Sequence, residues 1–240
     1  MRYNQVIAGQ FIDRPNRFIA HVKINGTAEV CHVKNTGRCR ELLVPGCTVY
    51  CAKSDNPNRK TLFDLIAVEK ICPGEQNKTL LINMDSQAPN AAAKEWLETK
   101  TLFPGLTYLK AEYKHGSSRF DFYLEEGPRK IFLEVKGVTL EENGVAAFPD
   151  APTERGIKHL HELAHSVSEG YAAYVLFVVQ MEDAKYFTPN RKTHAAFAEA
   201  LFAAQQAGVH LLAYTCKVTP DSMVIHKPCL LYTSPSPRDA

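Results

Sequence analysis

The pattern of apolar and polar positions changes near residue 84. Before it, short apolar stretches rich in β-branched residues predict six strands, at residues 5–12, 17–25, 27–34, 47–53, 62–70 and 79–84. Turn signals such as Asn25-Gly26 and Pro45-Gly46 separate the strands, and a helical turn is expected at 38–43. This spacing predicts a small barrel over residues 1–84, and an OB-type and an SH3-like barrel fit it equally.

After residue 84, helical and strand patterns alternate. We expect helices and strands in the order αβββαβαβ, at 88–100, 107–114, 119–125, 130–136, 153–169, 171–180, 191–207 and 209–216, with a further strand at 222–226. This order predicts an α+β second domain over 85–228, with a mixed sheet covered by helices. The Ser/Pro-rich end, 229–240, has no periodicity and is expected to be an unstructured or non-native tail.

Residues 119–136 read as two strands joined by a Gly-Pro turn. Alternation predicts one apolar face, formed by Phe120, Phe122 and Leu124 in the first strand and by Ile131, Leu133 and Val135 in the second. Pairing as a hairpin would bring Asp121, Glu134 and Lys136 together on the opposite face. Two carboxylates suit Mg²⁺, and a lysine beside them can orient water and stabilise charge on a phosphate. The alternative is a solvated face with a surface ion pair.

Composition is that of a globular protein, with 45% apolar and 22% charged residues. No apolar run is long enough for a membrane span, and the N-terminus lacks the apolar core of a signal peptide, so we expect a cytoplasmic protein. The seven cysteines are expected to be free thiols. Four of them lie between residues 31 and 51, at spacings that do not match paired zinc knuckles.

Charge is unevenly distributed along the chain. Residues 1–80 contain twelve Lys and Arg against seven Asp and Glu, whereas residues 81–240 contain sixteen against nineteen. A basic half beside a carboxylate cluster suits an anionic polymer held near a metal site, although a basic surface also aids solubility. The loop or strand-end cations of the first half are Arg14, Arg17, Lys34, Arg38 and Arg40.

Two further features are candidates for chemistry. Gln180 ends a nearly all-apolar strand, a position where α/β folds often place a site residue. Residues 161–165, HELAH, match the zinc-peptidase signature, with His161 and His165 on one helix face and Glu162 as base. No third ligand follows at a recognised spacing, so a zinc peptidase is a minor alternative to a pair of surface histidines.

Several segments resemble the sugar fermentation stimulation protein A (SfsA) family of bacteria and archaea. They are RPNRF at 14–18, NTGR at 35–38, SRFDF at 118–122, EVKGVTL at 134–140, FPDAPTERGIKHLHEL at 148–163 and VLFVVQ at 175–180. The resemblance implies an N-terminal OB fold and a C-terminal domain like the PD-(D/E)xK nucleases. It also implies non-specific DNA binding and a regulatory effect on sugar, especially maltose, metabolism. The nuclease motif then falls on Asp121, Glu134 and Lys136.

The leading hypothesis is a DNA-binding protein with a Mg²⁺- or Mn²⁺-dependent phosphodiesterase site. Asp121, Glu134 and the Val135 carbonyl would hold the metal, Lys136 would position water, and Glu112 or Glu95 would add a carboxylate. The residues expected to contact nucleic acid are Arg14, Arg17, Arg38, Arg119, Arg155, Lys158 and His159. The second hypothesis is a DNA-binding regulator that retains the fold without catalysis. RNA in place of DNA, and a homodimer in place of a monomer, stay open.

Overall fold

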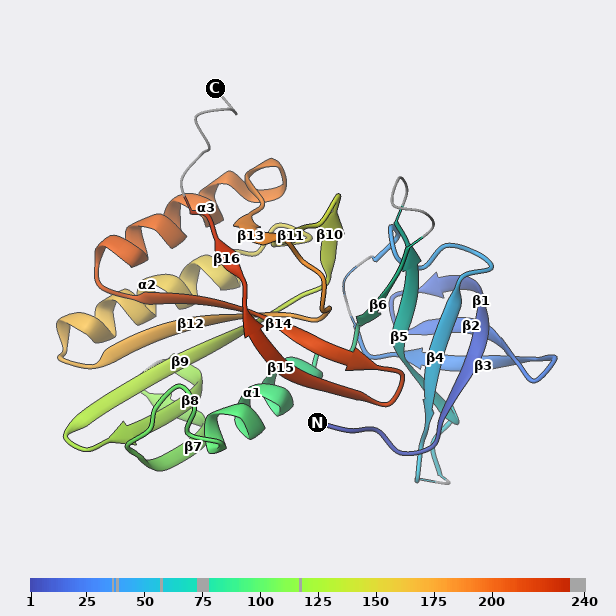
Figure 1. The fold of residues 1–240 in the computed structure, drawn as a ribbon, viewed down its shortest axis with the longest axis horizontal. Coiled ribbons are helices and arrows are strands. Elements are labelled where there is room, and N and C mark those ends of the chain that lie inside the picture. Colours follow the sequence, from blue (N-terminus) through green and yellow to red (C-terminus); the bar gives the residue numbers. More distant parts are fainter. Residues whose placement is uncertain (36, 38, 57, 73–77, 117, 234–240) are drawn as a thin grey trace.

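The structure, a computed structural model, describes residues 1–35, 37, 39–56, 58–72, 78–116 and 118–233. Two domains lie side by side, a β-barrel and a larger α/β domain (Figure 1). No helix in the described ranges has the length and apolarity needed to cross a membrane.

The N-terminal domain is a five-stranded barrel with one added strand. Its strands are β1 (Val6–Asn16), β2 (Ile19–Ile24), β3 (Thr27–Val33), β4 (Thr48–Lys53), β5 (Phe63–Ile71) and β6 (Thr79–Asn83). They are hydrogen-bonded in the order β3-β2-β1-β4-β5-β6, and a parallel β3–β5 pairing closes the ring. Alternate residues such as Val22 and Val49 fill the interior because successive strand side chains point to opposite faces. All six predicted strands are confirmed. The expected helical turn is present over residues 39–43 as a single turn, with Leu43 N donating to Cys39 O at 2.9 Å.

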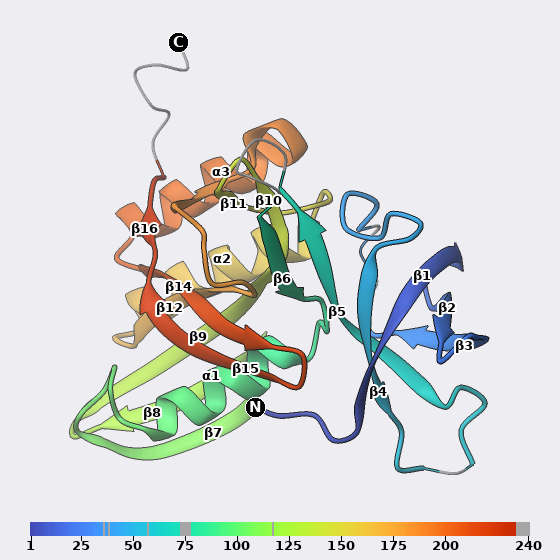
Figure 2. The ribbon, with the colours of Figure 1, turned by 45° about the vertical axis from the view of Figure 1, so that its right-hand side comes forward.

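The C-terminal domain is a six-stranded mixed sheet between helices. Its main elements are α1 (Ala88–Glu98), β7 (Leu106–His115), β8 (Ser118–Glu126), β9 (Arg129–Val138), α2 (Glu154–Ser168), β12 (Ala172–Val179), α3 (Arg191–Gln206), β14 (His210–Thr219) and β15 (Ser222–Pro228). The sheet order is β15-β14-β12-β9-β8-β7. Helix α1 covers one face, and α2 and α3 cover the other (Figures 1 and 2). The predicted αβββαβ order is confirmed.

A second, small sheet was not predicted. It contains β10 (Leu140–Glu142), β11 (Val145–Phe148), β13 (Tyr186–Pro189) and β16 (Leu230–Leu231), in that order. Its strands are two to four residues long, too short for periodicity to reveal them. The expected unstructured tail is wrong at Leu230–Leu231, which pair with β13; residues 234–240 lie outside the described residues.

Strand β12 places the candidate site residues at the centre of the large sheet. It runs parallel to both β9 and β14, and Val175 and Phe177 lie opposite Glu134 and Lys136. Every residue from Ala173 to Val179 is buried, as expected for a strand covered on both faces. Glu134 therefore lies on an inner strand of the sheet.

The predicted faces of the 119–136 hairpin are wrong at one position. Phe122 and Leu124 pack in the cluster below α1, whereas Phe120 packs on the other side of the sheet and stacks on Phe132 at 4.4 Å between ring centroids. The β8–β9 pairing stops at Phe122 and Leu133, and Phe120 lies beyond that point. β8 still pairs with β7 at Phe120, so strict alternation fails where β8 has separated from β9 alone.

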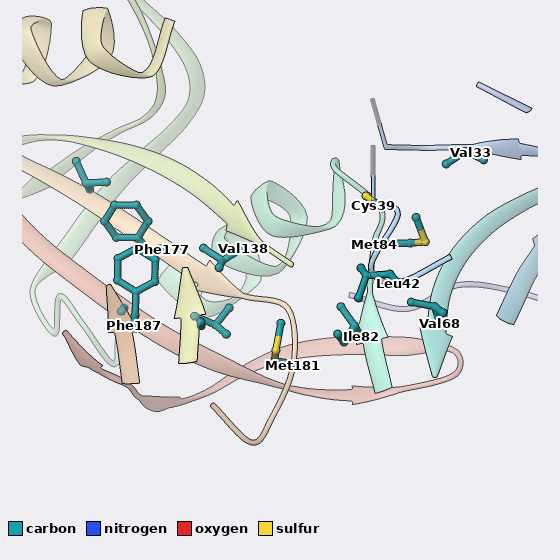
Figure 3. Packing of buried hydrophobic residues seen from close by; sticks show 14 of the residues in the cluster. Val33, Cys39, Leu42, Val68, Ile82, Met84, Val138, Phe177, Met181 and Phe187 are labelled. Atoms are coloured by element: carbon teal, nitrogen blue, oxygen red, sulfur yellow. The ribbon is translucent and has the colours of Figure 1, made fainter. Parts of the chain in front are cut away.

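The two domains share a continuous hydrophobic core. Met181, which follows β12, faces Ile82 and Leu42 of the barrel side, and Phe177 continues the core inward (Figure 3). Polar contacts also cross the domain boundary: Lys70 Nζ of β5 donates to Glu141 Oε2 of β10 at 2.6 Å. The domains are therefore packed against each other rather than merely connected.

The chain crosses between the domains twice, and the two crossings are bonded to each other. Residues 1–3 lie against the β15 hairpin, with Tyr3 N donating to Asp221 O at 2.7 Å. The Tyr3 hydroxyl donates to Asp85 Oδ2 at 3.1 Å and accepts from Asn83 Nδ2 at 3.0 Å. Asn83 and Asp85 belong to the second crossing, between β6 and α1.

Candidate active site

A cleft of about 280 Å³ lies where β8 and β9 stop pairing. It contains most of the predicted site residues. They come from the three strands β7, β8 and β9 and from the start of α2, and they are Glu112, Arg119, Phe120, Asp121, Glu134, Val135, Lys136, Arg155 and His159. The structure thus brings together the Asp, Glu and Lys of the nuclease motif.

Asp121 is held by two donors. Val135 N donates to Oδ2 at 2.7 Å, and Asn90 Nδ2 donates to Oδ1 at 2.8 Å. Burial, and then the nearby charge of Glu134, raise the pKa of Asp121 above its ordinary value. Two acidic groups that repel each other in a partly dry cleft form an arrangement that a cation would stabilise.

Glu134 is 3% exposed and is more tightly enclosed than Asp121. Its Oε1 accepts from Lys136 Nζ at 2.8 Å and contacts His159 Nδ1. Burial alone would raise the pKa of Glu134, but the hydrogen bond from His159 and the charge of Lys136 outweigh it and hold the pKa below its ordinary value. The carboxylate is therefore ionised, and the solvated-face alternative does not hold for it.

The second carboxylate oxygen of Glu134, Oε2, indicates whether a metal ion fits this cleft. Oε2 is buried and accepts no hydrogen bond from the described residues. A buried carboxylate oxygen normally has a partner, and leaving it without one costs roughly 1–3 kcal/mol. No group of three His, Cys, Asp or Glu is assembled for a metal in the described ranges. Two carboxylates with the remaining positions left to water and phosphate match the usual mode of Mg²⁺ binding.

His159 has a more central position than predicted. We expected a phosphate clamp at the start of α2, but its ring lies between Glu134 Oε1 and Arg155, whose Nε donates to His159 Nε2 at 3.3 Å. An accepting Nε2 assigns the proton to Nδ1, which then donates to Glu134. His159 thus orients the carboxylate, and Arg155 remains at the rim of the cleft.

The rim contains the other predicted cations. Arg119 forms an exposed ion pair with Glu112, so the extra carboxylate lies at the edge of the cleft and not beside Glu134. Lys158 lies 3.6 Å from Glu162 in the adjoining groove along α2. The side chains of Arg119 and Lys158 are exposed to solvent.

Other predicted residues lie outside the cleft. Glu95 Oε2 lies 2.5 Å from the N-terminal amine, and Gln180 is buried at the domain boundary, where its Nε2 donates to Asn83 O at 2.9 Å. Arg14 and Arg17 belong to the barrel, and Arg38 lies outside the described residues. The sequence did not predict Asn90 of α1, which donates a hydrogen bond to Asp121, because an Asn in the first turn of a helix has no distinguishing sequence pattern.

The described residues assemble no zinc site around HELAH. His161 and His165 are exposed on α2, and His165 Nε2 lies 3.6 Å from Glu169 Oε1. No third ligand joins them among the described residues. All seven cysteines are free thiols, as predicted.

Comparison with known proteins gives matches over both domains. Residues 12–74 match the family described as the SfsA N-terminal OB domain, which decides between the two barrel types. Residues 87–222 match the Sugar fermentation stimulation protein RE domain, where RE denotes a restriction-endonuclease-like fold.

Relatives that match over nearly their whole length point to the same family. The chain is 59% identical over 223 residues to a sugar fermentation stimulation protein homolog of Desulfitobacterium hafniense, covering 93% of this chain and 94% of the relative. It is 56% identical to the homolog of Ruminiclostridium cellulolyticum, covering 95% and 97%. A solved structure of Pyrococcus furiosus SfsA in complex with Ca²⁺ is 27% identical, with a TM-score of 0.82 over 97% of this chain and 98% of that chain.

Proposed function

The chain belongs to the sugar fermentation stimulation protein (SfsA) family, and on that premise we propose that it binds DNA and hydrolyses phosphodiester bonds with a divalent cation. The observation that carries the proposal is Glu134, buried with Oε2 unpartnered, beside Asp121 and Lys136. The regulation of sugar, especially maltose, metabolism for which the family is known is the cellular role we propose for DNA binding.

A divalent cation fits the donor set. Asp121 and Glu134 would hold Mg²⁺ or Mn²⁺, with the Val135 carbonyl as the third protein ligand that we propose. The Pyrococcus furiosus relative was solved with Ca²⁺, a hard cation with the same preference for oxygen ligands. When bound, the ion supplies an activated water and neutralises charge on the phosphate.

The remaining residues of the cleft would act on phosphate and water. Lys136 Nζ, 2.8 Å from Glu134 Oε1, is placed to orient the attacking water and to stabilise charge on the scissile phosphate. His159 keeps Glu134 in position, and Arg155 and Arg119 at the rim would bind flanking phosphates.

The test is cleavage of DNA by the wild type and by Glu134→Gln, with Mg²⁺, with Mn²⁺ and with chelator. We expect metal-dependent cleavage by the wild type and a loss of at least about 100-fold in the variant. Glu95→Gln is the matched control, because Glu95 is a glutamate outside the cleft. Equal cleavage by wild type and Glu134→Gln would refute the catalytic proposal.

The second candidate is a DNA-binding regulator without catalysis. It is favoured by the small number of carboxylates: Glu112 forms an exposed ion pair, and in the part of the chain that the structure describes only Asp121 and Glu134 converge. Binding without cleavage in either metal would select it. In both cases affinity should fall steeply with salt, since phosphate contacts release counterions.

A further inference from the structure

An exposed aromatic side chain stands on the barrel at the turn between β1 and β2. Phe18 is 47% exposed, yet its backbone is fixed, because Asn16 Oδ1 accepts from Phe18 N at 2.9 Å and Phe18 O accepts from Val33 N at 2.7 Å. The guanidinium of Arg17 lies 5.0 Å from the centre of the ring. An aromatic ring and a planar cation together are a surface on which unpaired bases stack.

Other exposed aromatic residues differ from Phe18. Tyr108 packs edge-on against Tyr123, and Tyr232 packs edge-on against Tyr186. Phe202 is 43% exposed on α3, on the outer side of the other domain. Among the exposed aromatic side chains of the described residues, Phe18 is the one with a cation over its ring.

Arg14 connects this turn to the domain boundary. Its guanidinium donates to the carbonyl of Arg17 at 2.7 Å, to that of Asn35 at 2.7 Å and to that of Gly37 at 2.8 Å. One side chain thus fixes the Phe18 turn against the loop that faces the second domain. Arg14 positions this surface rather than presenting its charge to solvent.

Asn35 and Gly37 form one wall of a cleft of about 340 Å³ between the domains. The opposite wall includes Gly137, Asp150 and Thr153. The walls approach closely, because a Cβ added at Gly37 would lie 2.6 Å from Asp150 Oδ2. The volume is near the lower end of pockets that hold one small ligand, roughly 300–1,000 Å³. Such a space suits an unpaired strand and not a duplex.

The interdomain cleft leads to the candidate active site along two elements. Gly137 follows Lys136 on β9, and Thr153 caps α2, whose first turns supply Arg155 and His159. The two clefts are therefore neighbours along β9 and at the start of α2.

We propose that Phe18 and Arg17 bind an unpaired base and that the interdomain cleft guides the same single strand to the site of Asp121 and Glu134. The inference rests on the proposed function and sharpens it, because it makes single-stranded nucleic acid, or the frayed end of a duplex, the preferred substrate. The proposed ligand has a phosphate backbone and unpaired bases with exposed faces, features that single-stranded DNA and RNA share.

The test separates binding from cleavage. Fluorescence anisotropy in chelator measures the affinity of the full chain for a labelled 20-nucleotide dT strand, the matching rU strand and a duplex of equal length. We expect tighter binding of the single strands, and a roughly tenfold loss for Phe18→Ala on single strands with little change on duplex, the size of one base stack. Phe18→Trp should retain the affinity, and Phe202→Ala is the matched control. The ratio of dT to rU affinity tells which nucleic acid is preferred.

The outcomes distinguish this inference from the proposed function. If Phe18→Ala binds single strands as the wild type does, or if duplex and single strand bind equally, the inference is overturned. Metal-dependent cleavage of duplex DNA in that same case would leave the proposed function intact. Phe18→Ala should fold normally because the ring is half exposed, which thermal unfolding of each variant verifies.

Discussion

Replacement of Gln180 by Leu separates a structural role from a catalytic one. Gln180 is 2% exposed and bridges the domains, with Nε2 donating to Asn83 O at 2.9 Å, to Asn83 Oδ1 at 3.2 Å and to Asp85 O at 3.2 Å. Leu has a similar shape and no donor. The substitution therefore removes the interdomain hydrogen bonds of this side chain and leaves the packing largely in place.

The cost follows from which acceptors lose their donor. A buried polar group without a partner costs about 1–3 kcal/mol. Asp85 O still accepts from Ala88 N at 3.2 Å, so its loss is partial, whereas Asn83 O loses its 2.9 Å donor. We expect a decrease of about 2–3 kcal/mol in the free energy of unfolding. Gln180→Glu should cost more, because it places a carboxylate against carbonyl oxygens.

The assay combines urea unfolding with cleavage. The midpoint should fall at an unchanged slope for Gln180→Leu, and the metal-dependent cleavage rate of the folded fraction should stay within about threefold of wild type. A catalytic role for Gln180, which its position at the end of β12 suggested, predicts instead unchanged stability and a loss of cleavage. Full stability with cleavage lost would refute the structural account.

Three further predictions address charge. Lys136→Met should lower metal-dependent cleavage by about 100-fold, while DNA affinity in chelator, measured by anisotropy, is retained. Arg59→Met should move acid unfolding to higher pH in a circular dichroism titration. Burial alone would raise the pKa of Asp64, but the hydrogen bonds from Arg59 hold this pKa below its ordinary value. The stabilisation by ionised Asp64 is therefore lost only as pH falls through that low pKa, and removing Arg59 should raise the pH at which it is lost. Lys70→Met should lower the free energy of unfolding by about 3–5 kcal/mol in urea, because Glu141 stays buried without a counter-ion. Adding Glu141→Gln should recover part of this loss.

The sequence predicts most of the long elements and the core of the site. Strands with clear alternation and helices of ten or more residues emerge from local pattern, and the motif spacing brings Asp121, Glu134 and Lys136 to one cleft. Local pattern fails at Phe120, which lies where β8 has separated from β9 although it still pairs with β7.

Contacts between distant segments could not be predicted. Asn90 reaches Asp121 across 31 residues, and His159 reaches Glu134 across 25, so their roles depend on how α1 and α2 dock on the sheet. For Gln180, the sequence predicted its position at a strand end but not its hydrogen-bond partner, which belongs to the other domain.

The paired crossings at Tyr3 and Asn83 have a consequence for how the molecule selects what enters it. A single linker would let the barrel swing, but here both linkers are bonded to each other through the Tyr3 hydroxyl. Opening the domains would break these bonds together with the shared core at Met181. The interdomain gap is therefore expected to keep a set width, and under the single-strand proposal the thickness of the ligand, and not a hinge motion, would decide whether it fits.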